Sequence, residues 1–409
     1  MYSIQSKQGD SAETISIRAY GNRSGASNIA AANPNIDFDN VPNGTMILIP
    51  VAGRIGTDTI ITDDPDQVTV IVNGERFYIW YDFKITLSLD RTADTFSFIL
   101  PFDPQNQALK LALMPFSYAT VKIYIGSEKI ITGTIIRTAP SLDDSAHVSV
   151  SGYSRCGILE DVCFSPSQYP IEYNNSSLVS IANAAIKPFG LTASQSSEVK
   201  KHLASSGSSN AWYNRTNAPV QGKIKGYLSS LAKKDGVIMS SDKDGNVLFD
   251  VMTNSKPVIT IKEGHQPFLS GNANFDGKKL YSHFTGFSQD WLGESYKTTV
   301  VNESVASRGV FRPYTVVQSD IDSGNLRTSI QSIIKRNSMD AISLNLNLST
   351  WRDDNKKLLY KNKNIFLYSP SLMIFKKTRM TIKEISFGRS ATSKFSELKV
   401  TTAFEELEL

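Results

Sequence analysis

The feature that most limits the fold is a long series of short runs, starting at Val68, in which apolar and polar residues alternate. Alternation of this kind is typical of half-buried β-strands. Asn73-Gly74 follows the first run and supplies the two positive-φ positions of a type I′ hairpin turn. Similar runs occupy 85–89, 96–100, 121–125 and 147–151. Short strands of this kind build antiparallel sheets or barrels, so a mainly β chain is expected.

From Val68 onward, helical periodicity appears in three stretches, 176–186, 222–235 and 325–337. Ser176 or Ser177 is expected to cap the first helix and Pro188 to stop it. Gly236 is expected to end the second helix, and a hairpin over 237–249 should follow. The fold class is therefore α+β, mainly β, with a few helices.

The segment 203–218 is rich in Ser and Asn and is predicted to be an exposed loop. Within it, Trp212 and Tyr213 are large aromatic residues in a polar setting. Such residues either anchor a loop to the body of the protein or contact a partner. Both interpretations stay open, and we favour anchoring.

Composition places the chain among soluble globular proteins, with 40% hydrophobic and 20% charged residues. A chain of 409 residues is expected to divide into several domains. Without an apolar run of about 18 residues no spanning helix is expected, and the first ten residues do not resemble a secretory signal. The net charge of +4, from 43 basic and 39 acidic residues, gives little support for nucleic-acid binding.

Residue patterns that carry catalysis or metal binding are not recognisable, so we predict a non-enzymatic protein without a cofactor. The histidines lack an HExxH spacing, and neither a G-x-S-x-G turn nor a phosphate-binding loop occurs. Cys156 and Cys163 are predicted to be half-buried thiols rather than a disulfide or a zinc site. Adjacent acids are expected to be solvated. The residues concerned are His147, His202, His265, His283, Asp143, Asp144, Glu405 and Glu406.

Residues 1–51 predict a βααβ unit, with two helix-like stretches between two short apolar strands. Asp10-Ser11 is expected to cap the first helix, and Asn33-Pro34 to end the second. Its motifs are Tyr2-Ser-Ile4, Gly9-Asp10-Ser11, Ile15, Tyr20-Gly21, Ile29, Ala32-Asn33-Pro34 and Pro42-Asn43-Gly44-Thr45-Met-Ile-Leu-Ile-Pro50. In these residues the unit resembles a LysM module.

This resemblance implies a groove between the first strand–helix loop and the second helix–strand loop. LysM modules are best known for binding N-acetylglucosamine polymers there. In phage tail proteins such a module also serves as an adaptor that packs against other proteins, and we favour packing over glycan binding. The same residues are also what the turns need for folding. Carried over, the groove consists of Gly9, Asp10, Ser11, Asn33, Pro34, Asn35 and Ile36.

A second set of motifs occurs in a fixed order between residue 68 and about 405. They are Val70-Ile-Val-Asn73-Gly74, Trp80, Thr95-Phe96-Ser97-Phe98, Gly133-Thr-Ile-Ile136, His147-Val-Ser-Val-Ser-Gly152, Ser154-Arg155, Leu159-Glu-Asp161-Val-Cys163, the segment 178–181, Pro188-Phe189-Gly190, Leu231-Ala-Lys-Lys-Asp-Gly236, Asp244-Gly245-Asn246, Trp351, Asn364 and Leu372-Met-Ile374. In this order they resemble the baseplate hub protein of phage Mu and its tail relatives. Tyr153 stands where that family often has a basic residue, and the LysM unit is an extension.

The resemblance to this hub family implies a homotrimer in which two tube-like β domains per subunit form a ring with pseudo-sixfold symmetry. Such a ring would join a sixfold tail tube to a threefold central spike in the baseplate of a contractile phage or phage-like tail. Its other partners would be baseplate wedge proteins, the tape measure, and DNA passing through the lumen during genome ejection. Assembly would take place in the host cytoplasm. The alternative function is a LysM-anchored tail protein that binds peptidoglycan or degrades the cell wall.

The expected domains follow from these resemblances and from shifts in composition. They are a LysM module over 1–51, a linker over 52–67, a first tube-like β domain over 68–175, a helix-containing middle domain over 176–270, and a second tube-like β domain with C-terminal strands over 271–409.

Overall fold

The structure is a computed structural model of the 409-residue chain. It describes residues 2–20, 25–49, 52–54, 65–77, 82–102, 104–105, 107–142, 146–205, 212–218, 222–234, 236–289, 295–319, 323–389, 394–403 and 406–407. The mainly β prediction is confirmed, because strands dominate the element order and most of them belong to one large sheet.

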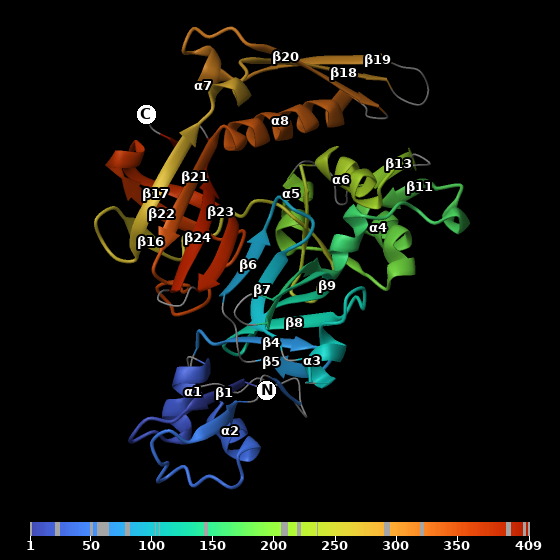
Figure 1. The fold of residues 1–409 in the computed structure, drawn as a ribbon. Helices are drawn as coiled ribbons and strands as arrows, with labels where there is room; N and C mark the ends of the chain where they lie inside the picture. The colour runs from blue at the N-terminus through green and yellow to red at the C-terminus, as the bar shows by residue number, and fades with distance from the viewer. Residues whose placement is uncertain are drawn as a thin grey trace.

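The N-terminal unit consists of two helices and a two-stranded antiparallel sheet at one end of the molecule (Figure 1). Its elements are β1 (Tyr2–Gln5), α1 (Ala12–Tyr20), α2 (Ala26–Ala32) and β2 (Met46–Ile49). Ile15, Ile29 and Ile47 are fully buried. They belong to the same contiguous apolar cluster as the interior of the large sheet, so the unit packs against the body.

The first β segment follows as a run of antiparallel strands. Its elements are β3 (Ala52–Arg54), β4 (Val68–Val72), β5 (Glu75–Phe77), β6 (Asp82–Ser88), β7 (Thr95–Pro101), α3 (Gln107–Ala112), β8 (Thr120–Ile125), β9 (Glu128–Leu142) and β10 (Ala146–Ser154). Asn73 and Gly74 have φ angles of 50° and 89°, which confirms the predicted turn between β4 and β5.

The middle segment has its own apolar core, formed by helices packed on short strands. Its elements are β11 (Glu172–Ser177), α4 (Leu178–Ile186), β12 (Ala193–Gln195), α5 (Ser197–Ser205), β13 (Trp212–Asn217), α6 (Ile224–Lys234), β14 (Ile238–Ser241) and β15 (Val247–Asp250). The predicted cap of α4 is confirmed, since Ser180 N donates to Ser177 Oγ at 3.2 Å. The predicted exposed loop over 203–218 is wrong in part, because β13 pairs with β11 and Leu203 is buried. The hydrogen bonds of this pairing are made by the backbone, so a strand can form here although its side chains are polar.

The C-terminal segment returns to the large sheet and also forms a projecting arm. Its elements are β16 (Thr260–Lys262), β17 (Phe268–Phe275), β18 (His283–Gln289), β19 (Ser295–Val301), α7 (Glu303–Ala306), β20 (Pro313–Ser319), α8 (Ser323–Asp340), β21 (Ile342–Leu348), β22 (Asn364–Ser369), β23 (Ile374–Arg389) and β24 (Lys394–Thr401). In the arm, one face of the sheet β19-β18-β20 packs on α8 (Figure 1). This arm accounts for the third predicted helix.

One antiparallel pairing joins the first and last β segments into a single sheet. Strand β23 pairs with β22 through its first half, whereas its second half pairs with β6, from Glu384 opposite Ser88 to Arg389 opposite Phe83. The resulting strand order is β17-β21-β24-β23-β6-β7-β10-β9-β8-β4-β5-β3. Strands almost 300 residues apart in sequence are therefore neighbours.

The division into five domains stays a prediction. Strand β17 runs across the expected boundary at 270, and β16 pairs with β22 of the last segment. In the expected linker, β3 pairs with β5, while 55–64 lie outside the described residues.

Candidate functional site

The polar residues of the predicted N-terminal groove are engaged in holding the unit together. Asn33 is 8% exposed, and its Nδ2 donates to the carbonyl oxygens of Ile29 and Leu48, both at 2.7 Å. Its Oδ1 accepts from Leu48 N at 2.8 Å. One side chain thus joins the end of α2 to β2, as expected of a residue that the turn requires.

The side chain of Asp10, at the start of α1, is likewise bonded to other residues of the unit. Its carboxylate accepts from Lys7 N at 2.7 Å and pairs with Arg18 at 2.8 Å. Burial acts to raise the pKa of Asp10, but the Lys7 N–H and the Arg18 guanidinium outweigh it and lower the pKa. Ser11 exchanges hydrogen bonds with Thr14 and caps the helix as predicted.

The other predicted groove residues are more accessible. Gly9, Pro34 and Asn35 are exposed, and Ile36 is half-buried and packs on the apolar cluster. Gly9 has a φ of 82°, a conformation that favours glycine. Asn35 is therefore the polar groove residue best placed to contact a ligand without a role in the fold. The function of the groove stays a prediction.

Trp212 and Tyr213 are the first two residues of β13, opposite Ser177 and Ser176 of β11. Their side chains lie outside the described part of the structure. The choice between anchoring and partner contact therefore stays open.

The two cysteines differ from the prediction of a similar pair of half-buried thiols. Cys156 is fully buried and Cys163 is exposed. The Sγ atom of Cys156 donates to Thr92 O at 3.1 Å, and burial raises the pKa of this thiol to about 12. Spacing in the sequence gives no measure of depth, which is why the prediction failed.

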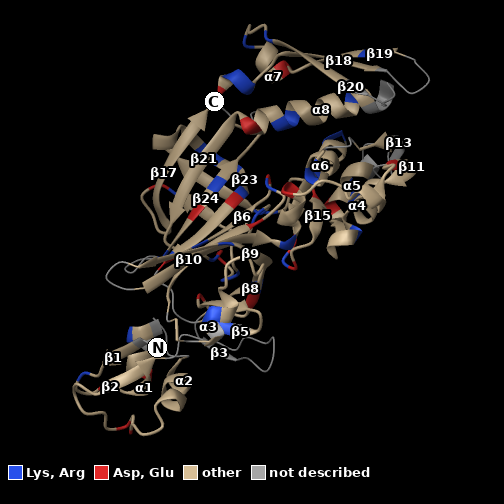
Figure 2. Ribbon diagram, turned by 45° about the vertical axis from the view of Figure 1, so that its right-hand side comes forward, with Lys and Arg blue, Asp and Glu red and all other residues tan. Residues whose placement is uncertain are grey.

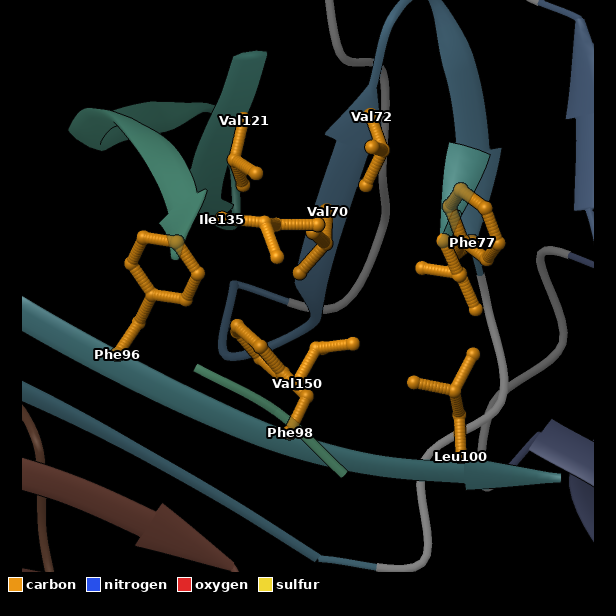
Figure 3. Close-up of a pocket in the computed structure, with 10 residues that line it drawn as sticks. Val70, Val72, Phe77, Phe96, Phe98, Leu100, Val121, Ile135 and Val150 are labelled. Carbon is orange, nitrogen blue, oxygen red and sulfur yellow. The ribbon is translucent and has the colours of Figure 1, made fainter. Parts of the chain in front are cut away.

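A small cavity in the first β segment is part of its packed interior. Figure 3 shows side chains from several strands pointing into this space. They leave a residual cavity of about 10 Å³, close to the smallest space that holds one water molecule. Because the lining is apolar, it offers no group that would orient a ligand. The lining residues are Val70, Val72, Phe77, Phe96, Phe98, Leu100, Leu113, Val121, Ile135 and Val150.

A buried ion cluster, formed by Asp94, Ser241 and Lys361, joins the three main segments. Lys361 Nζ lies 2.7 Å and 2.8 Å from the two carboxylate oxygens of Asp94, and Ser241 Oγ donates to the same carboxylate at 2.7 Å. Asp94 also accepts from Ser88 N at 2.8 Å. All three side chains are at most 4% exposed. The cluster fixes β14 and the loop before β22 against the turn between β6 and β7.

The face of the large sheet opposite its apolar core is covered mainly by hydroxyl and amide side chains. Three contacts between neighbouring strands show that these residues share one face: Asn345 with Asn272 at 3.0 Å, Asn347 with Ser270 at 2.8 Å, and the buried pair Thr86 with Ser386 at 2.9 Å. A fourth contact, Lys84 with Glu397 at 2.7 Å, reaches across β23 from β6 to β24. We call this surface the polar face. Figure 2 shows acidic and basic residues interspersed on these strands, without a basic stripe. Its described members include Ser270, Asn272, Asn345, Asn347, Glu397, Lys399, Glu384, Ser386, Lys84, Thr86, Thr95 and Ser97.

Two further surfaces of the chain are apolar and exposed. The apolar loop, formed by the end of α3 and the segment that leads to β8, consists of Leu111, Met114, Phe116 and Tyr118, which are 56%, 47%, 89% and 64% exposed. The apolar end patch consists of Leu269 on β17, Met373, and Phe375 at the start of β23, which are 52%, 60% and 60% exposed. The 3-10 turn Pro370–Leu372 packs against both β17 and β23 and brings Met373 to this place.

Backbone strain coincides with these two surfaces. Among the described residues other than glycine with positive φ, Phe116, Tyr118 and Met373 are the apolar ones, with φ angles of 61°, 50° and 62°. Each costs about 1 to 2 kcal/mol relative to an ordinary conformation. The polar ones are mainly asparagines, which adopt this conformation readily. In an isolated chain no contact offsets the cost of holding exposed apolar side chains in these conformations. The strain therefore points to a contact with another molecule.

Sequence reasoning missed the buried ion cluster, the polar face and both apolar surfaces. Asp94 and Lys361 are 267 positions apart and stand in no recognisable motif. For the polar face one signal was available in the sequence: Ser and Asn alternate with Leu over 343–347. A strand with this pattern buries its apolar side and exposes its polar side.

Two searches of the described residues, for clustered metal ligands and for membrane-spanning helices, gave the following results. The described part of the chain contains no group of three or more His, Cys, Asp or Glu side chains arranged to hold a metal ion. None of its helices has the length and hydropathy to cross a bilayer.

Comparison with known families finds a match for part of the chain. Residues 67–154 match the model of the family described as Mu phage baseplate assembly protein GpP-like, N-terminal. No curated protein matches the chain.

Solved structures share the fold over most of the chain. The 43 kDa tail protein of prophage MuSo2 from Shewanella oneidensis is 21% identical, with a TM-score of 0.68, over 83% of this chain and 99% of that one. The tail protein from Neisseria meningitidis MC58 is 16% identical, with a TM-score of 0.68, over 82% and 96%. Prophage tail protein gp18 from Listeria monocytogenes EGD-e is 9% identical, with a TM-score of 0.51, over 83% and 95%.

The matching family and the similar structures are structural baseplate and tail proteins, not enzymes. The fold is that of phage tail proteins, and the family match supports a structural role in a phage baseplate.

Proposed function

We propose that the chain is the structural hub of the baseplate of a contractile phage or phage-like tail. Three copies form a ring that joins the sixfold tail tube to the threefold central spike, with wedge proteins around it. DNA and the tape measure pass through its channel, and the ring assembles in the host cytoplasm before it becomes part of the virion tail.

One observation carries this proposal: the first and last β segments form a continuous sheet through the pairing of β6 with β23. A subunit with two β segments in one sheet contributes two similar sectors to a ring, so three subunits supply six. Such a ring matches a sixfold partner on one side and a threefold partner on the other. The buried ion cluster supports this role, because it holds the segments in one arrangement.

The polar face is suited to line the channel. Affinity for DNA depends mainly on contacts between cations and phosphates. On this wall of serine, threonine and asparagine, Lys84 pairs with Glu397 and Lys399 lies opposite Glu384, so acidic residues neighbour the cations that could hold the phosphates. DNA would slide along such a wall rather than bind to it.

Sedimentation velocity and native mass spectrometry test the ring directly. The purified chain, alone or mixed with its spike partner, should form a three-copy species. Open strand edges and exposed apolar residues would otherwise remain in contact with water. A stable monomer at every concentration, with the spike present, would contradict the hub.

For the N-terminal unit we propose a LysM-like adaptor that packs on other tail proteins. The support is that Asn33 and Asp10 are engaged within the unit. A pull-down on insoluble peptidoglycan should therefore retain little protein. Strong retention that is lost in Asn35→Ala would show glycan recognition instead. Asn33→Ala is unsuitable for this purpose, because it would also remove the hydrogen bonds that join α2 to β2.

The cell-wall-degrading alternative is tested by a zymogram. Full-length protein is expected to leave peptidoglycan intact. Clearing that survives removal of residues 1–55 would overturn the structural role.

A further inference from the structure

Strand β23 changes its pairing partner at Lys383, which occupies a β-bulge. Up to Thr381 the strand pairs with β22, and from Glu384 onward it pairs with β6. Its register with β24 shifts between Ile382 and Glu384, so Lys383 is the extra residue of the bulge. A bulge interrupts the ladder and lets a strand bend. The large sheet is therefore able to flex where its last β segment joins its first.

Lys383 is bonded to the arm and to the turn between β6 and β7 at the same time. Its Nζ lies 2.8 Å from the carboxylate of Asp340, the last residue of α8, and 2.7 Å from that of Asp90 in the turn. Its backbone oxygen accepts from Leu89 N at 2.7 Å. The Lys383 side chain is only 10% exposed. Burial acts to lower the pKa of Lys383, but the carboxylates of Asp90 and Asp340 outweigh it and raise the pKa, so the side chain stays charged.

The turn held by Lys383, residues 88–94, is also bonded to the middle segment. The backbone oxygen of Asp94 accepts from Ser154 N at 2.8 Å, and its carboxylate belongs to the buried ion cluster. Thr92 O accepts from the thiol of Cys156, which is part of the apolar core of the middle segment. We call Lys383 and the turn 88–94 the joint. A change in the joint reaches Cys156 directly.

The arm is a packed body of its own, joined to the large sheet near β21 (Figure 1). Its apolar core is distinct from those of the large sheet and the middle segment. At its root the arm is bonded to the sheet through polar groups: Asp340 pairs with Lys383, and Thr401 donates to the backbone oxygen of Met339. A body with its own core can move as a unit. The buried core residues of the arm are Phe284, Leu326 and Ile330.

We propose that the joint is a conformational switch latched by the arm: Asp340 keeps Lys383 in the bulge, and Lys383 keeps the turn 88–94 against Cys156. When the arm moves away, the buried cation loses one of its two carboxylates and gains by turning toward water. This movement draws Leu89 and Asp90 with it, because both are bonded to Lys383. The switch lies within one subunit and so goes beyond the proposed hub. In the proposed ring, a contact made on the arm would loosen the pairing of β6 with β23.

Maleimide labelling of Cys156 in a Cys163→Ser background, at several urea concentrations, measures opening of the joint. In this parent protein, labelling should require unfolding of the whole subunit and should therefore rise steeply with urea. Asp340→Asn should add a local route to the thiol. Labelling without urea should then be at least about tenfold faster than in the parent and nearly independent of low urea concentrations.

The matched control is Glu406→Gln. It removes a carboxylate that is 39% exposed, against 40% for Asp340, from an ion pair with Arg379 of the same strand β23. The pair lies away from the bulge, so labelling of Cys156 should stay at the parent rate. Urea unfolding of each variant shows whether the subunit is folded and separates local opening from a loss of overall stability.

Hydrogen exchange gives a second measurement that does not use the thiol. In Asp340→Asn the segment 88–94 should exchange faster, whereas the arm around Leu326 should keep the parent rate. Labelling and exchange that stay at the parent rate in Asp340→Asn would overturn the switch, and so would an increase that only follows the loss of overall stability. Each of these results leaves the hub standing, because the three-copy species is measured separately by sedimentation.

Discussion

At the residue scale, the side chains with the largest structural effect have their partners far away in the sequence. Asp94 is fully buried and is satisfied by Lys361, Ser241 and the backbone of Ser88. Exposed ion pairs such as Lys129 with Asp244 contribute much less, because water competes with both ions. Depth of burial therefore separates the ion pair that holds the segments together from those on the surface.

Lys361→Met should lower the free energy of unfolding by about 3 to 5 kcal/mol, because it leaves the buried carboxylate without its cation. Urea unfolding measures the loss. The matched control, Lys129→Met, removes a cation from an exposed pair and should cost at most about 1 kcal/mol. Equal effects of the two changes would contradict the assigned role of the cluster.

The two thiols should differ sharply in reactivity. At pH 8 a maleimide should label Cys163 quickly, whereas Cys156 should react only when the protein unfolds, because it is buried and its pKa is raised to about 12. Mass spectrometry of the labelled protein counts the modified sites. Rapid double labelling of folded protein would show that Cys156 is accessible.

The raised pKa of Cys156 also makes stability depend on pH. Above the ordinary thiol pKa of 9.0 the unfolded chain loses this proton while the folded chain keeps it. Ionisation then favours the unfolded state, so stability should fall as the pH rises from about 9 toward 10. Cys156→Ser removes the titrating group, and its stability should fall less over this range.

At the element scale, sequence predicted best what is local. The helices α4, α6 and α8 and the hairpin turn at Asn73-Gly74 were predicted because their patterns lie within one element. Helix α5 was missed because only Val199 and Leu203 are buried on it, too narrow a stripe to detect. The pairing of β6 with β23 was out of reach, because no local pattern identifies the partner of a strand so distant in sequence.

The same limit applied to the candidate site. Asn33 and Asp10 were correctly placed in the turns around α2 and α1, although sequence could not show that their polar atoms are engaged. The apolar loop was missed because a segment such as Leu111–Tyr118, apolar and without clear periodicity, looks like ordinary core. Exposure and backbone strain become visible only in three dimensions.

The hairpin β14–β15 gives a test of packing between elements. Gly245 and Gly264 both have positive φ, 77° and 75°, so alanine strains both backbones similarly. A Cβ at Gly245 would lie 2.3 Å from Thr132 O of β9, whereas one at Gly264 meets no atom within 4 Å. Gly245→Ala should therefore destabilise the protein by more than Gly264→Ala, which should cost about 1 kcal/mol. Hydrogen exchange should quicken at β14–β15 in the first variant and stay unchanged there in the second.

At the scale of the whole molecule, the chain presents one sheet with unlike ends and two unlike faces. One face is buried against apolar cores, and the other carries hydroxyl and amide groups. A surface of that kind neither packs against a second core nor attracts a polyanion strongly. Such a surface is suited to form the inner wall of an assembly.

The central claim is that three copies enclose a passage lined by the polar face. Electron cryomicroscopy of the three-copy species, alone or on its spike partner, measures this directly. We expect a ring of three subunits with six β sectors, with Asn272, Asn345 and Lys84 facing a continuous central channel. A three-copy particle without a central passage, or one whose channel is lined by other surfaces of the chain, would contradict the account.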